Sequence, residues 1–247
     1  MTVSINPPLK GKRALVTGGS KGIGAAIVER LAMDGADVVF VDIDEKNTLL
    51  VSEKTNTNGV CADLLDFDLI QTLIKSKGPF DILVNNAGVD QHAFFTQTSQ
   101  DDWRFLLAIN LEASFNSIHA VLPTMQANGF GRIINISSEA GRGGSRGGSV
   151  YAAAKGGIHA FTKSIALENG KKGITANAIC PGPIDTPLLR AAVDKYGEKL
   201  LGSMESATVV NRLGTPQEVA SLVAYLSREE AGFITGEIIG VSGGMGI

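Results

Sequence analysis

The sequence has few of the residue types that build metal centres and disulfide frameworks. Its two cysteines, Cys61 and Cys180, lie far apart and each within an apolar run, so we expect neither a disulfide framework nor a zinc site. The three histidines, His92, His119 and His159, are not paired along the chain, which leaves a metal-centred mechanism with few ligands. We therefore predict that the protein has no metal site.

The sequence also lacks clustered charge and long hydrophobic runs. Its net charge is −3 and neither sign is concentrated, which argues against a nucleic-acid or membrane-surface footprint. We find no continuous apolar run of about 18 residues, so we expect no membrane span. The N-terminal residues lack the charged start and apolar core of a secretory signal, and we therefore predict a cytoplasmic protein.

Glycine, in contrast, is abundant, and short apolar runs alternate with amphipathic stretches along the chain. The 30 glycines among 247 residues lie mostly where apolar runs end. The apolar runs predict buried parallel strands at residues 14–16, 38–41, 60–62, 82–84, 132–136, 174–179 and 237–241. The amphipathic stretches predict helices at 23–34, 99–110, 113–128, 151–169 and 216–227. This alternation indicates an α/β, doubly wound (Rossmann-like), parallel seven-stranded sheet with helices on both faces, in a single domain, 1–247.

A glycine-rich turn, Thr17–Gly24, joins the first predicted strand to the first predicted helix. Glycines let a backbone approach a pyrophosphate closely, and the free N–H groups at a helix N-terminus bind its charge. Such a turn alone can be a simple tight loop, but the flanking strand and helix favour a dinucleotide site. The candidate residues are Gly18, Ser20, Lys21, Gly22, Ile23 and Gly24.

The residue that ends the second predicted strand, Asp42, bears on the choice of dinucleotide. A carboxylate there accepts hydrogen bonds from ribose hydroxyls and repels a 2′-phosphate, which favours NAD over NADP. Lys21 argues the other way, because its ammonium could pair with that phosphate, or it could simply be a solvated cation. We give Asp42 the greater weight and predict NAD, with NADP as the alternative.

The ends of the third and fourth predicted strands supply further candidates for cofactor binding. Asp63 and Leu64 follow the third strand, where Asp63 could face an adenine. The Asn86–Gly88 backbone, which includes Ala87, follows the fourth and could face a ribose. The side chain of Asn85 could equally tie neighbouring strands together.

Tyr151 and Lys155 lie four residues apart in a predicted helix, and therefore on one helix face. A phenol ordinarily titrates near 10, and a nearby ammonium lowers its pKa towards the range useful for proton exchange. Ser138, at the end of the fifth strand, could hydrogen-bond a substrate oxygen. Asn110 could hold a water that links Lys155 to solvent. Alone, the tyrosine–lysine pair could be two unrelated residues of one helix face.

Together with Pro181–Gly182, these residues resemble the short-chain dehydrogenase/reductase family, over nearly the whole chain. The resemblance implies hydride transfer between a nicotinamide cofactor and a secondary alcohol or ketone. Tyr151 would be the acid/base, Lys155 would lower its pKa and bind the nicotinamide ribose, Ser138 would steady the substrate oxygen, and Asn110 would complete a proton relay. The nicotinamide carboxamide site implied by the resemblance comprises Pro181, Gly182, Ile184 and Thr186.

The resemblance also bears on substrate and assembly. It points to a branch near 2-hydroxycyclohexanecarboxyl-CoA dehydrogenase and the 3-oxoacyl carrier-protein reductases, hence to cyclic, aryl or acyl-thioester substrates. We expect the substrate pocket at 89–95, 139–150 and 186–204, with 186–212 as a mobile cover. Arg142 and Arg146 could meet an acidic substrate or lie solvated. The resemblance suggests a homotetramer that pairs helices 99–128 and 151–169 between subunits.

Two alternatives to an NAD-dependent dehydrogenase remain open at the level of the sequence. One is an NADPH-dependent 3-oxoacyl or ketone reductase, which a dominant role of Lys21 would favour. The other is a non-catalytic dinucleotide-binding sensor, against which the complete set of Asn110, Ser138, Tyr151 and Lys155 argues.

Overall fold

A computed structural model of the protein describes residues 7–246. Its strands form one parallel sheet in the order β3-β2-β1-β4-β5-β6-β7. Their bounds are β1 Arg13–Thr17, β2 Asp37–Asp42, β3 Asn58–Cys61, β4 Ile82–Asn85, β5 Gly131–Ile136, β6 Ile174–Pro181 and β7 Ile238–Val241. The predicted seven-stranded, doubly wound sheet is confirmed.

The strand order reverses at β1: β2 and β3 follow on one side of it, and β4 to β7 follow on the other. Strand β1 therefore pairs with both β2 and β4. Thr17, the last residue of β1, lies opposite Val41 of β2 and Asn85 of β4. The connections that leave β1 and β4 therefore turn to opposite faces of the sheet. A crevice opens between them at the carboxyl ends of the strands, which is where ligands bind in sheets of this kind.

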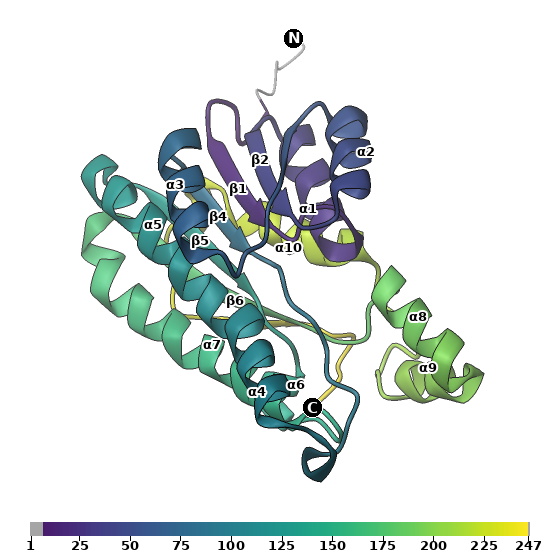
Figure 1. Ribbon diagram of the computed structural model, residues 1–247. Helices are drawn as coiled ribbons and strands as arrows, with labels where there is room; N and C mark the ends of the chain where they lie inside the picture. The colour runs from purple at the N-terminus through teal and green to yellow at the C-terminus, as the bar shows by residue number, and fades with distance from the viewer. Residues whose placement is uncertain (1–6, 247) are drawn as a thin grey trace.

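Helices cover both faces of the sheet (Figure 1). Their bounds are α1 Gly22–Met33, α2 Glu45–Thr55, α3 Phe67–Lys77, α4 Gln100–Leu107, α5 Ala113–Asn128, α6 Ala140–Gly143, α7 Ser149–Asn169, α8 Pro187–Tyr196, α9 Glu198–Ser206 and α10 Pro216–Leu226. The five predicted helices are present as α1, α4, α5, α7 and α10. The structure adds α2, α3, α6, α8 and α9, which the sequence analysis did not identify.

Two apolar cores hold these layers together. On one face, α1 and α10 pack against the sheet through residues such as Ile27, Leu31 and Val223. On the other face, α3, α5 and α7 pack through residues that include Ile70 and Ile118. Because apolar side chains occupy both faces of the strands, the sheet is rigid at the edge where the crevice opens.

Residues Gln100–Asn128 form one continuous helix in which a π-helical turn, Ala108–Glu112, joins α4 to α5. By length and composition alone this helix could cross a membrane. Its most apolar window is 44% buried within the fold, where it contacts α3, β4, β5 and α7. Packing against these elements accounts for its buried apolar residues, such as Leu106, Ile118 and Val121.

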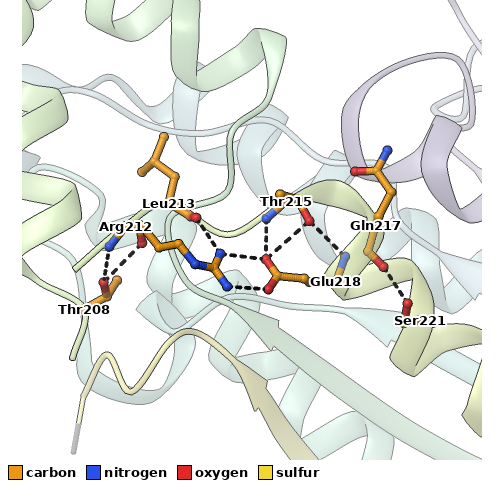
Figure 2. A network of polar contacts seen from close by, with 7 residues as sticks. All are labelled: Thr208, Arg212, Leu213, Thr215, Gln217, Glu218 and Ser221. Carbon is orange, nitrogen blue, oxygen red and sulfur yellow. Dashed lines mark hydrogen bonds and ion pairs between the residues drawn. The ribbon is translucent and has the colours of Figure 1, made fainter. Parts of the chain in front are cut away.

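The segment between β6 and α10 folds into α8 and α9, which project from the body of the fold (Figure 1). An ion-pair network fixes the point where this segment returns, as Figure 2 shows. Arg212 donates to both carboxylate oxygens of Glu218, at 3.0 and 2.6 Å, and the Thr215 N–H donates to the same carboxylate at 2.8 Å. Thr215 also caps α10 ahead of Pro216, which occupies the first helical position.

Candidate active site

A cavity of about 700 Å³ lies at the carboxyl ends of the strands. It is lined by all but one of the residues that the sequence analysis assigned to the site. These are Gly18, Lys21, Gly22, Ile23, Gly24, Asp42, Asp63, Leu64, Asn86, Ala87, Gly88, Asn110, Ser138, Tyr151, Lys155, Pro181, Gly182, Ile184 and Thr186. The exception, Ser20, is buried beneath the glycine turn and does not reach the cavity wall.

The glycine turn between β1 and α1 has no room for a side chain at Gly18 or Gly24. A Cβ at Gly18, whose φ is +66°, would lie 2.8 Å from the Ala87 Cα. A Cβ at Gly24 would lie 1.8 Å from the Gly18 carbonyl oxygen. Both glycines are therefore required for α1 to begin directly against β1 and the loop after β4.

The start of α1 fits the pyrophosphate of a dinucleotide. The residue that precedes α1, Lys21, makes no side-chain capping hydrogen bond, whereas α2, α3, α4, α8 and α10 are all capped by a side chain. The first N–H groups of α1 thus lack a side-chain acceptor at the cavity wall. N–H groups without side-chain acceptors at a helix N-terminus suit a bound anion. The Ser20 hydroxyl also has no hydrogen-bond partner, but it is buried beneath the turn and is not at the cavity wall.

Acidic side chains dominate the cavity beside the end of β2. The Asp42 carboxylate accepts hydrogen bonds from the Ser20 and Asp44 N–H groups, both at 3.0 Å. Lys21 forms an ion pair with Asp44. The hydrogen bond to Asp44 raises the pKa of Lys21, and the same contact lowers the pKa of Asp44. The ammonium of Lys21, which the sequence analysis weighed against Asp42, is thus neutralised by a second carboxylate.

Ser138, Tyr151 and Lys155 meet at the opposite end of the cavity. Tyr151 and Lys155 lie on one face of α7, with the Lys155 Nζ 5.7 Å from the centre of the tyrosine ring. The Lys155 Nζ donates to the Ile136 carbonyl at 3.1 Å, and Tyr151 shares a side-chain hydrogen bond with Ser138. The end of β5 and the first turns of α7 therefore place a hydroxyl, a phenol and an ammonium together.

Burial controls the titration of Tyr151 and Lys155 in the ligand-free protein, where the pKa of the phenol lies above its ordinary value and not below it as expected. Burial raises the pKa of Tyr151 to about 12, an effect that the hydrogen bond from Ser138 only partly offsets. Burial also lowers the pKa of Lys155 to about 8, against the opposing charges of Asp90 and Cys180. For each side chain, the removal of its charged form from water outweighs the neighbouring groups that stabilise that form, which are Ser138 for Tyr151 and Asp90 and Cys180 for Lys155.

Asn110 lies in the π-helical turn between α4 and α5, with its side chain 1% exposed. Its Oδ1 accepts from the Val89 N–H at 3.2 Å, and its Nδ2 donates to the Val89 and Leu106 carbonyls at 3.0 Å each. These bonds use both N–H groups of the amide nitrogen and one lone pair of Oδ1. The second lone pair of Oδ1 can therefore accept a hydrogen bond from a water. Asn85, in contrast, is a tie between strands, since its Nδ2 donates to the Asn135 Oδ1 at 2.9 Å.

The predicted substrate walls are only partly correct. Val89, Asp90, Thr186, Pro187 and Leu188 line the cavity. The structure describes all of residues 139–150, and none of them lines it. Residues Ala140–Gly143 of that stretch fold into α6 instead.

Side chains that were candidates for substrate contact have other partners. Arg142 forms an ion pair with Glu139 and donates to the Ile238 carbonyl. The Arg146 guanidinium lies 5.6 Å from the centre of the Phe94 ring. The Phe95 ring stacks on Trp103 at 5.1 Å, outside the cavity.

The cavity also contains residues that the sequence analysis missed, among them Ile43, Phe105, Ile109 and Ser137. Ile43, Ser137 and Ile109 each adjoin a predicted site residue, so adjacency at a strand or helix end was an available signal. Phe105 is an exposed apolar side chain, and its spacing alone gives no such signal.

Comparison with known proteins agrees with this geometry. The family model described as enoyl-(acyl carrier protein) reductase matches residues 18–246. The chain is 39% identical over 243 residues to a 3-oxoacyl-(acyl-carrier-protein) reductase of Vibrio harveyi, covering 96% of this chain and 98% of that protein. It is 40% identical over 241 residues to an acetoacetyl-CoA reductase of Shinella zoogloeoides, covering 94% and 97%.

A solved structure supports the same assignment. A variant actinorhodin polyketide ketoreductase with NADPH superimposes with a TM-score of 0.91 at 31% identity, covering 95% of this chain and 97% of that one. The sequence relatives, the solved structure and the cavity all agree with the resemblance drawn from the motifs. The chain belongs to the short-chain dehydrogenase/reductase family of nicotinamide-dependent oxidoreductases.

Proposed function

We propose that the protein reduces a ketone to a secondary alcohol, with NADH as the preferred cofactor and Tyr151 as the proton donor. The observation that carries this proposal is the meeting of Ser138, Tyr151 and Lys155 at one end of a cavity whose other end is the glycine turn. A reduced nicotinamide bound in this cavity would supply hydride to the carbonyl carbon.

Each of the catalytic side chains has a distinct role in the proposal. Tyr151 donates its phenolic proton to the carbonyl oxygen, and the Ser138 hydroxyl hydrogen-bonds that oxygen and holds it in place. Lys155, fixed by the Ile136 carbonyl, stabilises the phenolate that forms and binds the nicotinamide ribose. Asn110 holds a water through its free lone pair, so that a proton from solvent can return to the site.

The pKa of Tyr151 supports its role as the acid in the reductive direction. With a pKa of about 12, the phenol of the ligand-free protein is protonated at neutral pH and can donate its proton to a carbonyl oxygen. The relatives named above are described as reductases, in agreement with this direction.

The preference for NADH rests on the acidic end of the cavity. Asp42 would accept hydrogen bonds from the ribose hydroxyls and repel a 2′-phosphate, and Asp44 neutralises the cation nearest to that position. The second candidate is an NADPH-dependent reductase, favoured by the similar ketoreductase solved with NADPH. Titration of both dinucleotides against intrinsic fluorescence separates the two, and tighter binding of NADPH would overturn the role of Asp42.

The substrate class is tested with a panel of ketones, read by the loss of NADH absorbance. We propose cyclic, aryl or acyl-thioester ketones, and acetoacetyl-CoA enters the panel because a relative is named for its reduction. Turnover of at least one class is expected, together with loss of turnover in Tyr151→Phe. A failure of the whole panel with normal dinucleotide binding would instead support a non-catalytic sensor.

Assembly and location complete the proposal. Phe105 and Phe115 are exposed on the helix Gln100–Asn128, and Phe115 contacts Phe161 of α7 at 4.3 Å between ring centres. We propose that these faces pair between subunits of a cytoplasmic homotetramer, and that residues 186–212 move to cover the substrate. A monomer mass in light scattering at micromolar concentration would rule out the tetramer.

A further inference from the structure

The start of α7, the helix that carries Tyr151, is capped by a side chain from a distant loop. The residue that precedes the helix, Gly148, has no side chain to cap it. Instead, the Gln91 Oε1 accepts hydrogen bonds from the Val150 N–H at 2.9 Å and from the Tyr151 N–H at 3.2 Å. Two of the N–H groups that a helix leaves without a partner are thus satisfied by one amide oxygen.

Gln91 is itself held in one orientation. Its side chain is 7% exposed, and its Nε2 donates to the Ala93 carbonyl at 3.0 Å. The Ala93 N–H in turn donates to the Gly147 carbonyl at 3.0 Å, so that the loop after β4 is bound to the turn before α7 by its backbone as well. Gln91 is not among the residues that line the cavity.

The same loop is fixed at its other end by Asn110, which binds both the N–H and the carbonyl of Val89. The short stretch from Val89 to Ala93 therefore connects Asn110 to the backbone of Tyr151. Any shift of the first turn of α7 would change the direction of the Tyr151 hydroxyl relative to Ser138. Shifts of about 1 Å in a reacting group are enough to lower rates by about a hundredfold.

We propose that Gln91 is a positioning residue of the reaction: its amide oxygen holds the first turn of α7 and thereby aims the Tyr151 hydroxyl at the substrate oxygen beside Ser138. This inference rests on the proposed function, since it takes Tyr151 as the proton donor. Gln91 acts only through the helix, because the cavity wall formed by the described residues does not include it.

The test compares two substitutions at Gln91 with a matched control, a glutamine of α5 that supports the far end of α7. Gln91→Met keeps the length of the side chain but removes both acceptor bonds, whereas Gln91→Glu keeps the acceptors and loses the donor to Ala93. The control is Gln126→Met, because the Gln126 Nε2 donates to the Asn169 Oδ1 at 2.7 Å and so supports the far end of α7.

We expect Gln91→Met to lower kcat about 10- to 100-fold, with KM and the Kd for NADH and NADPH within about twofold of the wild type. Gln91→Glu should recover kcat to within about fivefold of the wild type, because a carboxylate also accepts from helix N–H groups. Gln126→Met should lower the Tm and leave kcat within about twofold, since it does not touch the first turn.

A second readout does not depend on turnover. Hydrogen exchange should accelerate at the Val150 and Tyr151 amides in Gln91→Met and not in Gln126→Met, measured without cofactor. Unchanged kcat in Gln91→Met, or an equal fall of kcat in Gln126→Met, would overturn the role of Gln91 in an active wild type. Inactivity of the wild type on the whole ketone panel is a separate result, which would overturn the proposed function and with it this role.

Discussion

The two ends of the cavity differ in how far their charged side chains are exposed to solvent. Beside β2, Lys21 and Asp44 pair at the surface, with 51% and 27% of their side chains exposed. Beside α7, Lys155 is 4% exposed, and burial shifts the pKa of both Lys155 and Tyr151 towards their neutral forms. The proposed function therefore assigns the choice of dinucleotide to solvated groups and the chemistry to buried groups. Substitutions should be tolerated at the first end and costly at the second.

The most severe test of this contrast is Tyr151→Phe, which removes only the phenolic oxygen. We expect kcat to fall by about 10³-fold, because a general acid in the transition state contributes about 10²–10⁴-fold. Binding of NADH should stay within about threefold, since the pyrophosphate and adenosine end is unchanged. Steady-state kinetics and fluorescence titration measure the two quantities. Tyr225→Phe, on α10, is the control, and substantial turnover by Tyr151→Phe would refute the assignment of the acid.

Lys155→Met is expected to be next in size, with kcat lower by about 10²-fold. The free energy of unfolding, in contrast, should be higher in Lys155→Met than in the wild type at neutral pH. The folded-state pKa of Lys155, about 8, lies below the ordinary lysine value of 10.5, so the unfolded chain binds more protons between these values. The wild type should therefore gain stability as the pH rises from about 8 to about 10.5, an effect that is absent from the variant.

Denaturant unfolding as a function of pH measures this difference between the wild type and Lys155→Met. The matched control is Lys163→Met, an exposed lysine of the same helix, which should keep the wild-type pH dependence. If the wild type and Lys155→Met showed identical pH dependence, burial of the ammonium would not be the controlling effect.

At the end of the cavity beside β2, Asp42→Asn should change the preference between NADH and NADPH rather than kcat. Removal of the carboxylate is expected to weaken NADH binding and strengthen NADPH binding, each by about tenfold, because ribose hydrogen bonds and phosphate repulsion are lost together. Asp37→Asn, at the opposite end of β2, is the control and should leave both Kd values unchanged. A large loss of kcat with saturating cofactor in Asp42→Asn would break the distinction between the two ends.

The smallest effect is expected at the return of the α8–α9 segment, where the charges are again exposed. The hydrogen bond from Arg212 lowers the pKa of Glu218 from 4.5 to about 2. The contribution of the ionised Glu218 carboxylate to the free energy of unfolding is thus complete above pH 4.5 and is lost as the pH falls towards 2. In Glu218→Gln the Tm should be about 2 °C lower at neutral pH and less sensitive to acid, while Glu237→Gln should match the wild type.

The sequence was sufficient for the sheet and for most of the cavity wall, for identifiable reasons. Buried parallel strands are continuous apolar runs, and strand ends place Asp42, Asp63 and Gly88 at one edge. Helix α2 was missed because only Thr48 of its residues is buried, so it has almost no apolar stripe.

The electrostatics of the catalytic end and the role of Gln91 were not available from the sequence. Helical spacing correctly places Lys155 beside Tyr151 but does not give the burial that decides the direction of their pKa shifts. The partners of Gln91 lie 59 and 60 residues away, and only the folded chain brings them together.

The ionisation of Tyr151 in the ligand-free protein tests the central claim most directly. Because the chain contains three tyrosines, NMR of the ring Cζ signals in ¹³C-labelled protein resolves each titration, with Tyr151→Phe to assign the signal. Burial predicts that Tyr151 stays protonated well above the ordinary phenol pKa of 10.0, with a midpoint near 12. A midpoint below 10.0 would contradict this and would show that Lys155, not burial, governs the site.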